Sequence, residues 1–146
     1  YDSHSVSFGY EKDGELIASL RIVCDSNLGL PSEKYCPEIK TIKSNYTTVE
    51  GSRTVILPEF QGSSGILVQL LMACRQFSYI NGIDNVIYCS ERPIYEMYEK
   101  SFAKQKLIRE NVKYGDVEVP LVLASWKPES MYPSFEKMYN RFETRN

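Results

Sequence analysis

Two charged residues, Glu50 and Arg53, bracket the tetrapeptide EGSR, which runs directly into the apolar segment TVIL. Burying an unpaired charge costs several kcal/mol, so charged residues at the start of a buried strand require a structural or functional explanation. A carboxylate placed there could act as a general base for an amine, directly or through a water molecule. The alternative is an ion pair between the two residues at a solvated strand end.

Arg21 is a second arginine within a β-favouring segment, residues 15–23. Alternation along a strand places its two apolar neighbours on the opposite face of the sheet. Arg21 and Arg53 could form a bidentate network with Asp2 and Glu50 that organises a pocket or holds a carboxylate. The alternative is ordinary pairing on the sheet surface, where such pairs contribute only about 0 to 1 kcal/mol.

The segment QGSSGIL offers a different chemistry at the start of a helix. Backbone N–H groups at a helix N-terminus attract anions, and side chains as small as these leave those groups open. A simple capping turn is the alternative, and both roles can hold together. The residues concerned are Gln61, Gly62, Ser63, Ser64 and Gly65.

Composition excludes several classes of protein. A net charge of -2 and a pI near 5.5 give no basic surface for nucleic acid, and the apolar segments are too short to span a membrane. His4 is the sole histidine and the cysteines form no C-x-x-C pair, so we expect no metal site. The cysteines are best explained as reduced core residues of a cytoplasmic protein, and they are Cys24, Cys36, Cys74 and Cys89.

The first half of the chain predicts antiparallel strands. Residues 6–10 and 15–23 favour β-structure, and Asp13-Gly14 between them is a strong hairpin signal. Residues 24–38 are rich in turn formers and predict an irregular connection with one helical turn near Ser32. A strand over residues 52–57 follows, and Pro58 ends it.

The second half predicts alternating helices and strands. Apolar residues recur at helical spacing from Gly65 to Phe77, and Asn81-Gly82 supplies the stop. A strand at 85–89, a helix at 93–104, a strand at 117–126 and a terminal helix at 134–143 follow. We therefore expect one α/β domain, residues 1–146, with a mixed and mostly antiparallel sheet around a parallel strand-helix-strand core.

Residues 55–102, with this order of elements, resemble the acyl-donor-binding core of the GNAT acyltransferases. The segments YDSHSV, LIASLRIV and EGSR are similar to the branch that contains N-acyl amino acid synthases and acyl-homoserine-lactone (autoinducer) synthases. The connection LGLPSE resembles the acyl amino acid synthases more closely. The resemblance extends to about Trp126.

The resemblance implies an N-acyltransferase that moves an acyl group, expected to be long, from a thioester to the amine of an amino acid or similar small acceptor. Glu50 would be the general base, and Tyr98 would give a proton to the departing thiolate, although a packing role for Tyr98 is the alternative. Backbone N–H groups would stabilise the oxyanion near Val55, Ile56 and Leu57. The other functions considered are an autoinducer synthase and an acyl-binding domain without catalysis.

The donor implied is either acyl-CoA or the acyl-phosphopantetheine of an acyl carrier protein. QGSSGIL carries one residue more than the loop of the superfamily, and Leu67 replaces its last small residue. Both departures favour the carrier protein, whose phosphopantetheine lacks the adenosine diphosphate portion of CoA. The family also carries a segment before its Tyr-Asp motif, and we expect this chain to lack it.

Overall fold

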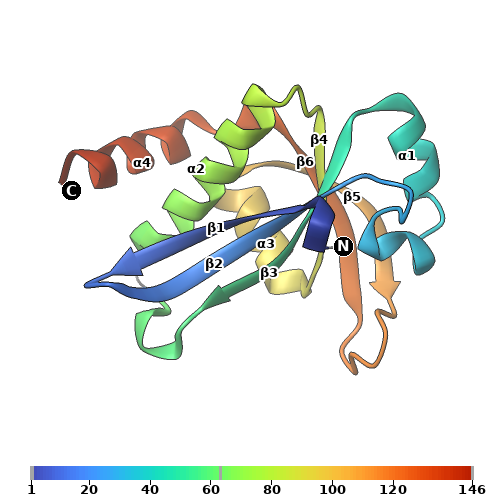
Figure 1. Ribbon diagram of the computed structural model, residues 1–146, viewed down its shortest axis with the longest axis horizontal. Helices are drawn as coiled ribbons and strands as arrows, with labels where there is room; N and C mark the ends of the chain where they lie inside the picture. Colours follow the sequence, from blue (N-terminus) through green and yellow to red (C-terminus); the bar gives the residue numbers. More distant parts are fainter. Residues whose placement is uncertain (1, 63, 146) are drawn as a thin grey trace.

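The computed structural model describes residues 2–62 and 64–145 and is built around a six-stranded sheet of order β1-β2-β3-β4-β6-β5 (Figure 1). All neighbouring strands are antiparallel except β3 and β4, which are parallel. The mixed, mostly antiparallel sheet predicted from the sequence is confirmed. The strands are β1 (Ser5–Lys12), β2 (Glu15–Cys24), β3 (Thr48–Ile56), β4 (Asn85–Ser90), β5 (Ala103–Val112) and β6 (Leu121–Met131).

Helices cover both faces of the sheet. On one face α2, α3 and α4 enclose the larger apolar core, which includes Phe102 and Trp126. On the other face a smaller core forms around Ile39, Ile87 and Leu123, beneath η2 and α1. The helices are η1 (Asp2–His4), η2 (Pro31–Lys34), α1 (Ile39–Asn45), η3 (Pro58–Phe60), α2 (Ser64–Ile80), α3 (Arg92–Ser101) and α4 (Pro133–Arg145).

The sheet opens at its centre, between the two parallel strands. The residue pairs between β3 and β4 are Thr48↔Asn85, Val49↔Val86 and Glu50↔Ile87. Beyond these pairs β3 continues beside β2, and β4 continues beside β6. The edges of β3 and β4 therefore separate just after Glu50, and the EGSR tetrad lies where they part.

A β-bulge at Arg53 bends the strand at this point. Arg21 pairs with Ser52 and Ser19 pairs with Val55, so two residues of β3 oppose one residue of β2. Arg53 has a φ of 48°, in the left-handed region that an L-residue with a side chain adopts at a cost. Bulges bend the strand that carries them, which accounts for the divergence of β3 from β4.

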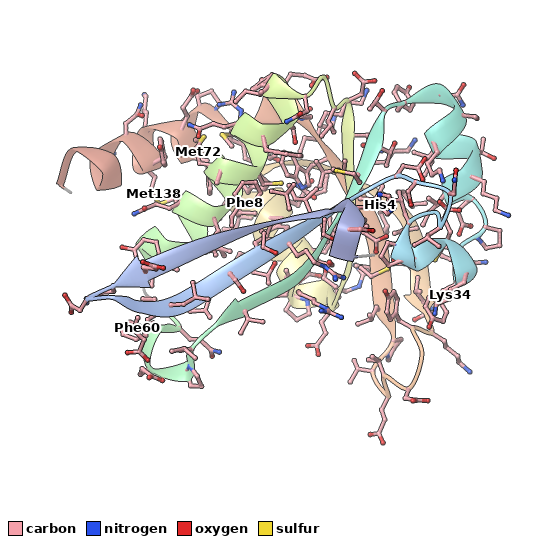
Figure 2. The ribbon with its side chains drawn as sticks, in the orientation of Figure 1. His4, Phe8, Lys34, Phe60, Met72 and Met138 are labelled. Atoms are coloured by element: carbon pink, nitrogen blue, oxygen red, sulfur yellow. The ribbon has the colours of Figure 1, made fainter. Side chains whose placement is uncertain are left out.

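The amino-terminal strands pack against α2. Phe8 and Phe77 meet edge to face with ring centroids 5.9 Å apart. Figure 2 shows Phe8 between the β1-β2 hairpin and α2 and Met72 on the side of α2 that faces α4, whereas His4 and Lys34 lie towards the other end of the molecule. Of the helices that the described residues form, none combines the length and apolar character that crossing a lipid bilayer requires.

One helix was not predicted, and several predicted boundaries differ from the structure. Residues 39–45 form α1, a helix for which we made no prediction. The helix predicted over residues 93–104 ends at Ser101, because Ala103 is fully buried and pairs with Met131 of β6 at the start of β5. The strand predicted from residue 117 begins at Leu121, directly after Pro120, which cannot donate to a ladder.

Candidate functional site

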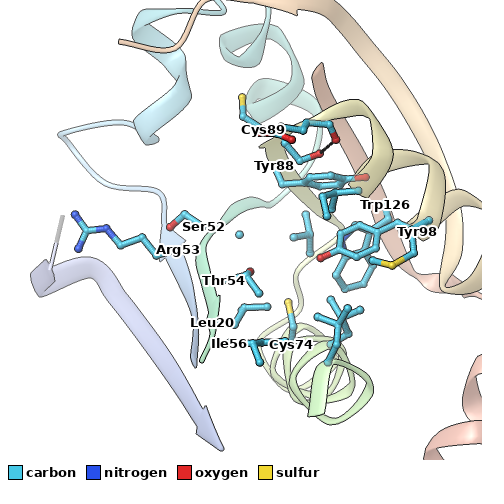
Figure 3. A pocket seen from close by; sticks show the side chains of 18 of the residues that line it. Leu20, Ser52, Arg53, Thr54, Ile56, Cys74, Tyr88, Cys89, Tyr98 and Trp126 are labelled. Carbon is cyan, nitrogen blue, oxygen red and sulfur yellow. Dashed lines mark hydrogen bonds between the residues drawn. The ribbon is translucent and has the colours of Figure 1, made fainter. Parts of the chain in front are cut away.

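A cavity of about 580 Å³ occupies the opening between β3 and β4 (Figure 3), and we call it the donor cavity after the role that the sequence predicts for this region. Its walls come from both parting strands, from α2 and from α3. Apolar side chains dominate its inner part, including Leu20, Leu71, Val86 and Trp126. Thr54 and the backbone around Arg53 line it on the β3 side. Such a cavity can hold a long apolar group beside an exposed strand edge.

Tyr98 reaches this cavity from α3 (Figure 3). Tyr98 is 8% exposed, and its ring packs edge to face against Tyr88 and Phe102. It therefore has the packing role that we considered as the alternative. Burial raises the pKa of Tyr98 to about 12, which keeps the phenol protonated at neutral pH. A protonated phenol beside the cavity can donate a hydrogen bond or a proton, and the role of Tyr98 as proton donor stays a prediction.

Of the three residues predicted to supply oxyanion donors, Ile56 has the suitable orientation. The Leu57 N–H donates to Ile17 O at 2.9 Å, so this group is engaged with β2 and is not available. Successive backbone N–H groups of a strand point in opposite directions, so the Val55 N–H also faces β2 and the Ile56 N–H faces away. Ile56 lines the donor cavity.

The predicted phosphate loop lies next to the donor cavity. Gln61 lines the cavity, and its side-chain Nε2 donates to Ile56 O at 3.1 Å. Gly62 has a φ of 89°, which glycine adopts without strain. Gly65 lies in the first turn of α2. Ser63 is outside the described residues, and the side chain of Ser64 is not described, so their predicted roles stay predictions.

A second cavity of about 380 Å³ lies on the opposite face of the sheet, and we call it the acceptor cavity after the role predicted for Arg21 and Glu50, which line it. Arg21, Glu50 and Ser52 contribute to it from β2 and β3. Tyr35 and Tyr114 contribute an aromatic pair with ring centroids 4.5 Å apart. This cavity is smaller and more polar in character than the donor cavity, which suits a small charged molecule.

Glu50 is almost entirely buried, with 2% of its surface exposed. Its carboxylate accepts the backbone N–H of Ser32 at 3.0 Å and a short hydrogen bond from the Ser32 hydroxyl. Burial raises the pKa of Glu50 above its ordinary value, while Ser32 and the charge of Arg21 partly oppose that rise. Among the described residues Glu50 and Arg53 form no ion pair, and the burial of Glu50 excludes a solvated strand end for this residue.

Three residues of this cluster were missed as functional residues. Ser32 was predicted only as part of a helical turn, yet it is fully buried and holds both oxygens of Glu50. Its hydroxyl lies 3.3 Å from Cys89 Sγ, and burial raises the pKa of the Cys89 thiol to about 12. Burial and the nearby carboxylate raise the pKa of Tyr114 to about 12. Pro31, which starts η2, was the sequence feature that could have drawn attention to Ser32.

The structure describes Arg21 and Arg53 of the predicted network, and the network as a whole stays a prediction. Arg21 lies on the acceptor face, and its Nε donates to Ser52 Oγ at 3.1 Å. Arg53 lines both cavities, but its side chain is exposed and extends away from the inner residues of the donor cavity (Figure 3). The backbone of Asp2 belongs to η1, which lies against β2, but its side chain is not described.

The two cavities meet at the point where the strands part. Gly51, Ser52, Arg53 and Cys89 line both of them. Glu50 faces only the acceptor cavity, and Tyr98 faces only the donor cavity. A carboxylate and a phenol therefore lie on opposite sides of the residues that the two cavities share, an arrangement suited to transfer between two bound molecules.

Comparison with known proteins decides the family. A family model described as N-acyl amino acid synthase FeeM matches residues 1–127 of the chain. The chain belongs to the FeeM family of N-acyl amino acid synthases. The family assignment confirms the predicted class of enzyme, a GNAT-type N-acyltransferase. Among curated proteins, none matches the chain significantly.

Solved structures share the fold of this FeeM-family chain. FeeM itself, an N-acyl amino acid synthase from uncultured soil microbes, is 18% identical with a TM-score of 0.75, over 86% of this chain and 74% of that one. The CoA-dependent acyl-homoserine lactone synthase BjaI is 12% identical with a TM-score of 0.73, over 96% of this chain and 65% of that one. The chain thus spans less than two thirds of BjaI.

An acetyltransferase with a bound cofactor is also similar. PaiA N-acetyltransferase from Thermoplasma acidophilum, in complex with coenzyme A, is 16% identical with a TM-score of 0.54, over 85% of this chain and 61% of that one. At these identities the likeness is one of fold. It confirms the GNAT-like architecture that the sequence predicted for the FeeM-family chain.

Proposed function

We propose that this chain transfers an acyl group from a phosphopantetheine thioester to the amine of an amino acid or a similar small acceptor. The observation that carries the proposal is the junction of the two cavities at Gly51, Ser52, Arg53 and Cys89. An acyl thioester would lie in the apolar donor cavity. The amine would approach from the acceptor cavity, which contains Glu50.

The acceptor must first lose a proton, because an ammonium group cannot attack a carbonyl carbon. Glu50 is the group placed to accept this proton, directly or through a water molecule. Its raised pKa makes it a stronger base than an exposed glutamate. Ser32 holds the carboxylate in position, and the charge of Arg21 can attract the carboxylate of an amino acid acceptor.

The neutral amine then forms a bond to the thioester carbon, and the carbonyl oxygen gains a negative charge. The Ile56 N–H, directed to the edge of β3, is our candidate donor to this oxygen. When the carbon-sulfur bond breaks, the sulfur leaves as a thiolate and takes a proton from Tyr98, and the phenol is restored by the proton that the attacking nitrogen loses as it becomes an amide, directly or through water. Since a thiol has a pKa near 8.5, this last step needs little more than a hydrogen bond.

We infer direct transfer, without an acyl-enzyme. The thiolate is the nucleophilic form of cysteine, and burial raises the pKa of both Cys74 and Cys89 to about 12. Ser32 is fully buried, and the residues that line the acceptor cavity include its neighbour Pro31 but not Ser32 itself. These three side chains are thus poorly suited to take up the acyl group.

For the donor, we propose acyl-CoA or an acyl carrier protein. BjaI is described as CoA-dependent, and the PaiA structure contains coenzyme A. The lengthened loop at residues 61–67 supports the carrier protein instead. The four free cysteines suit a reducing compartment, which supports a cytoplasmic location.

Mass spectrometry of reaction mixtures tests this function. The full chain is incubated with long-chain acyl-CoA or acyl carrier protein and with the standard amino acids, each in turn. We expect an N-acyl amino acid whose formation depends on the protein. S-adenosylmethionine serves as a parallel acceptor, and an acyl-homoserine lactone from that reaction alone would identify an autoinducer synthase. Tight binding of acyl-CoA without any product would indicate the other alternative, an acyl-binding domain without catalysis.

Ser32→Ala is predicted to shift the pH dependence of transfer. Because the Ser32 hydroxyl lowers the pKa of Glu50, its removal raises that pKa, and the acidic limb of the kcat profile moves to higher pH. We expect a larger loss of kcat at mildly acidic pH than at alkaline pH. Ser78→Ala is the matched control, since Ser78 is also fully buried and its hydroxyl donates to Cys74 O. Equal profiles for both variants would contradict the positioning role.

A further inference from the structure

A third cavity, of about 300 Å³, lies beside α1. Its walls come from α1 and from β4, β5 and β6, near the edge of the sheet that β5 forms. Asn85 shares the face of β4 that also carries Ile87 of the smaller core, because side chains two residues apart lie on one face. This third cavity is therefore on the α1 face, and α2 and the predicted phosphate loop are on the other.

The third cavity is positively charged. Lys104, Lys106 and Lys127 line it, and its lining includes neither aspartate nor glutamate. Within residues 2–62 and 64–145, none of these lysines forms a salt bridge with a carboxylate. Lys127 Nζ lies 5.1 Å from the centre of the Tyr46 ring, which holds this ammonium group at the rim. Three uncompensated charges gather here although the whole chain has a net charge of -2.

Two buried polar side chains also line this cavity. Asn85 is 5% exposed and Ser125 is 4% exposed. No side-chain hydrogen bond of Asn85 or Ser125 is found among the residues that the structure describes, and their polar atoms are not among the fully enclosed atoms that lack a partner, so these groups open onto the cavity. The Asn85 amide and the Ser125 hydroxyl can both donate hydrogen bonds into the cavity. They complement the lysines as partners for an anion with several oxygens.

We propose that the third cavity is a binding site for a small phosphate-bearing anion, separate from the donor and acceptor cavities. Lysine is a common point-charge partner of phosphate, and neutral donors at the floor would complete the coordination of its oxygens. The volume is at the lower end of the range for ligand sites, about 300 to 1,000 Å³. The proposal does not depend on acyl transfer, so it can fail while the proposed function stands.

Titration of the full chain with inorganic phosphate and with glycerol 3-phosphate tests this site. Amide NMR shifts are followed at constant ionic strength set with potassium chloride. We expect saturable shifts in β5, β6 and the end of α1. Lys106→Gln and Lys127→Gln should each weaken binding about tenfold or more, and Asn85→Asp should abolish it by placing a like charge at the floor. Tighter binding of glycerol 3-phosphate would indicate a phosphate monoester rather than free phosphate.

Lys100→Gln and Lys137→Gln are the controls, because both lysines are exposed and lie outside the three cavities. Their binding constants should equal that of the wild type. Melting temperatures show whether each variant is folded. The proposal is overturned if the controls weaken binding equally, if the shifts appear at residues 61–67 instead, or if no saturable shift occurs in folded protein.

Discussion

Glu50→Gln is expected to lower kcat roughly 100-fold to 10,000-fold, the range for loss of a general base. The amide has the size of the carboxylate and can still accept the Ser32 N–H while donating to the Ser32 hydroxyl. It cannot take a proton from the acceptor ammonium. Wild-type kcat should fall with decreasing pH below an acidic limb that lies above 4.5, because burial raises the pKa of Glu50. The variant should lack this limb, and initial rates over a series of buffers measure both effects.

The same variant should remain folded. A carboxyl group whose pKa is raised in the folded state favours folding below its unfolded-state pKa, and this contribution is lost as pH rises through the folded-state pKa. At neutral pH the ionised Glu50 therefore opposes folding, and Glu50→Gln should melt at the same temperature as wild type or higher. Glu59→Gln, on exposed η3, is the matched control. Wild-type rates in Glu50→Gln would exclude Glu50 as the base.

Gly51→Val is expected to lower kcat/KM by about 100-fold or more, because the junction is where the reacting atoms must meet. A Cβ at Gly51 would lie 3.8 Å from Val86 Cγ1 and 4.0 Å from Ile87 O, both ordinary contacts. The two added methyl groups of valine then reach into the junction and displace the thioester. Valine suits a strand, so the variant should fold.

Gly51→Ala separates the size of the side chain from the loss of glycine. The methyl group fits the same space without crossing the junction, and Gly51 does not have the positive φ that would strain an alanine. We expect Gly51→Ala to retain most of its activity in the assay that shows Gly51→Val to be inactive. Equal activity of the two variants, with intact melting curves, would show that the acyl group is transferred elsewhere.

Local sequence patterns were sufficient for most of the fold. Asp13 and Gly14 have φ values of 54° and 80°, as a tight hairpin turn requires. Alternation correctly separated Arg21 from its buried neighbours. The period of apolar residues located α2, and Gly82, with a φ of 63°, follows its end. In each case the signal lies within a few residues of the structure that it predicts.

The remaining features depend on contacts between distant residues. Ala103 joins β5 because it pairs with Met131, although the residues before it favour a helix. Ser32 and Glu50 are 18 positions apart, and only the packing of η2 against β3 brings them together. The orientation of Arg53 follows from the β-bulge, where this residue has a φ of 48°. No local sequence pattern predicts such a φ for an arginine. The sequence therefore indicated Glu50 and Arg53, but it did not indicate Ser32, which binds the Glu50 carboxylate.

Initial rates measured while both substrates are varied test the central claim, that donor and acceptor occupy two joined cavities at the same time. Direct transfer in a ternary complex predicts that double-reciprocal lines for different acceptor concentrations intersect. Mass spectra of the protein with acyl donor alone should show no covalent acyl group. Parallel lines, together with an acylated side chain such as Ser32 or Cys89, would contradict the account.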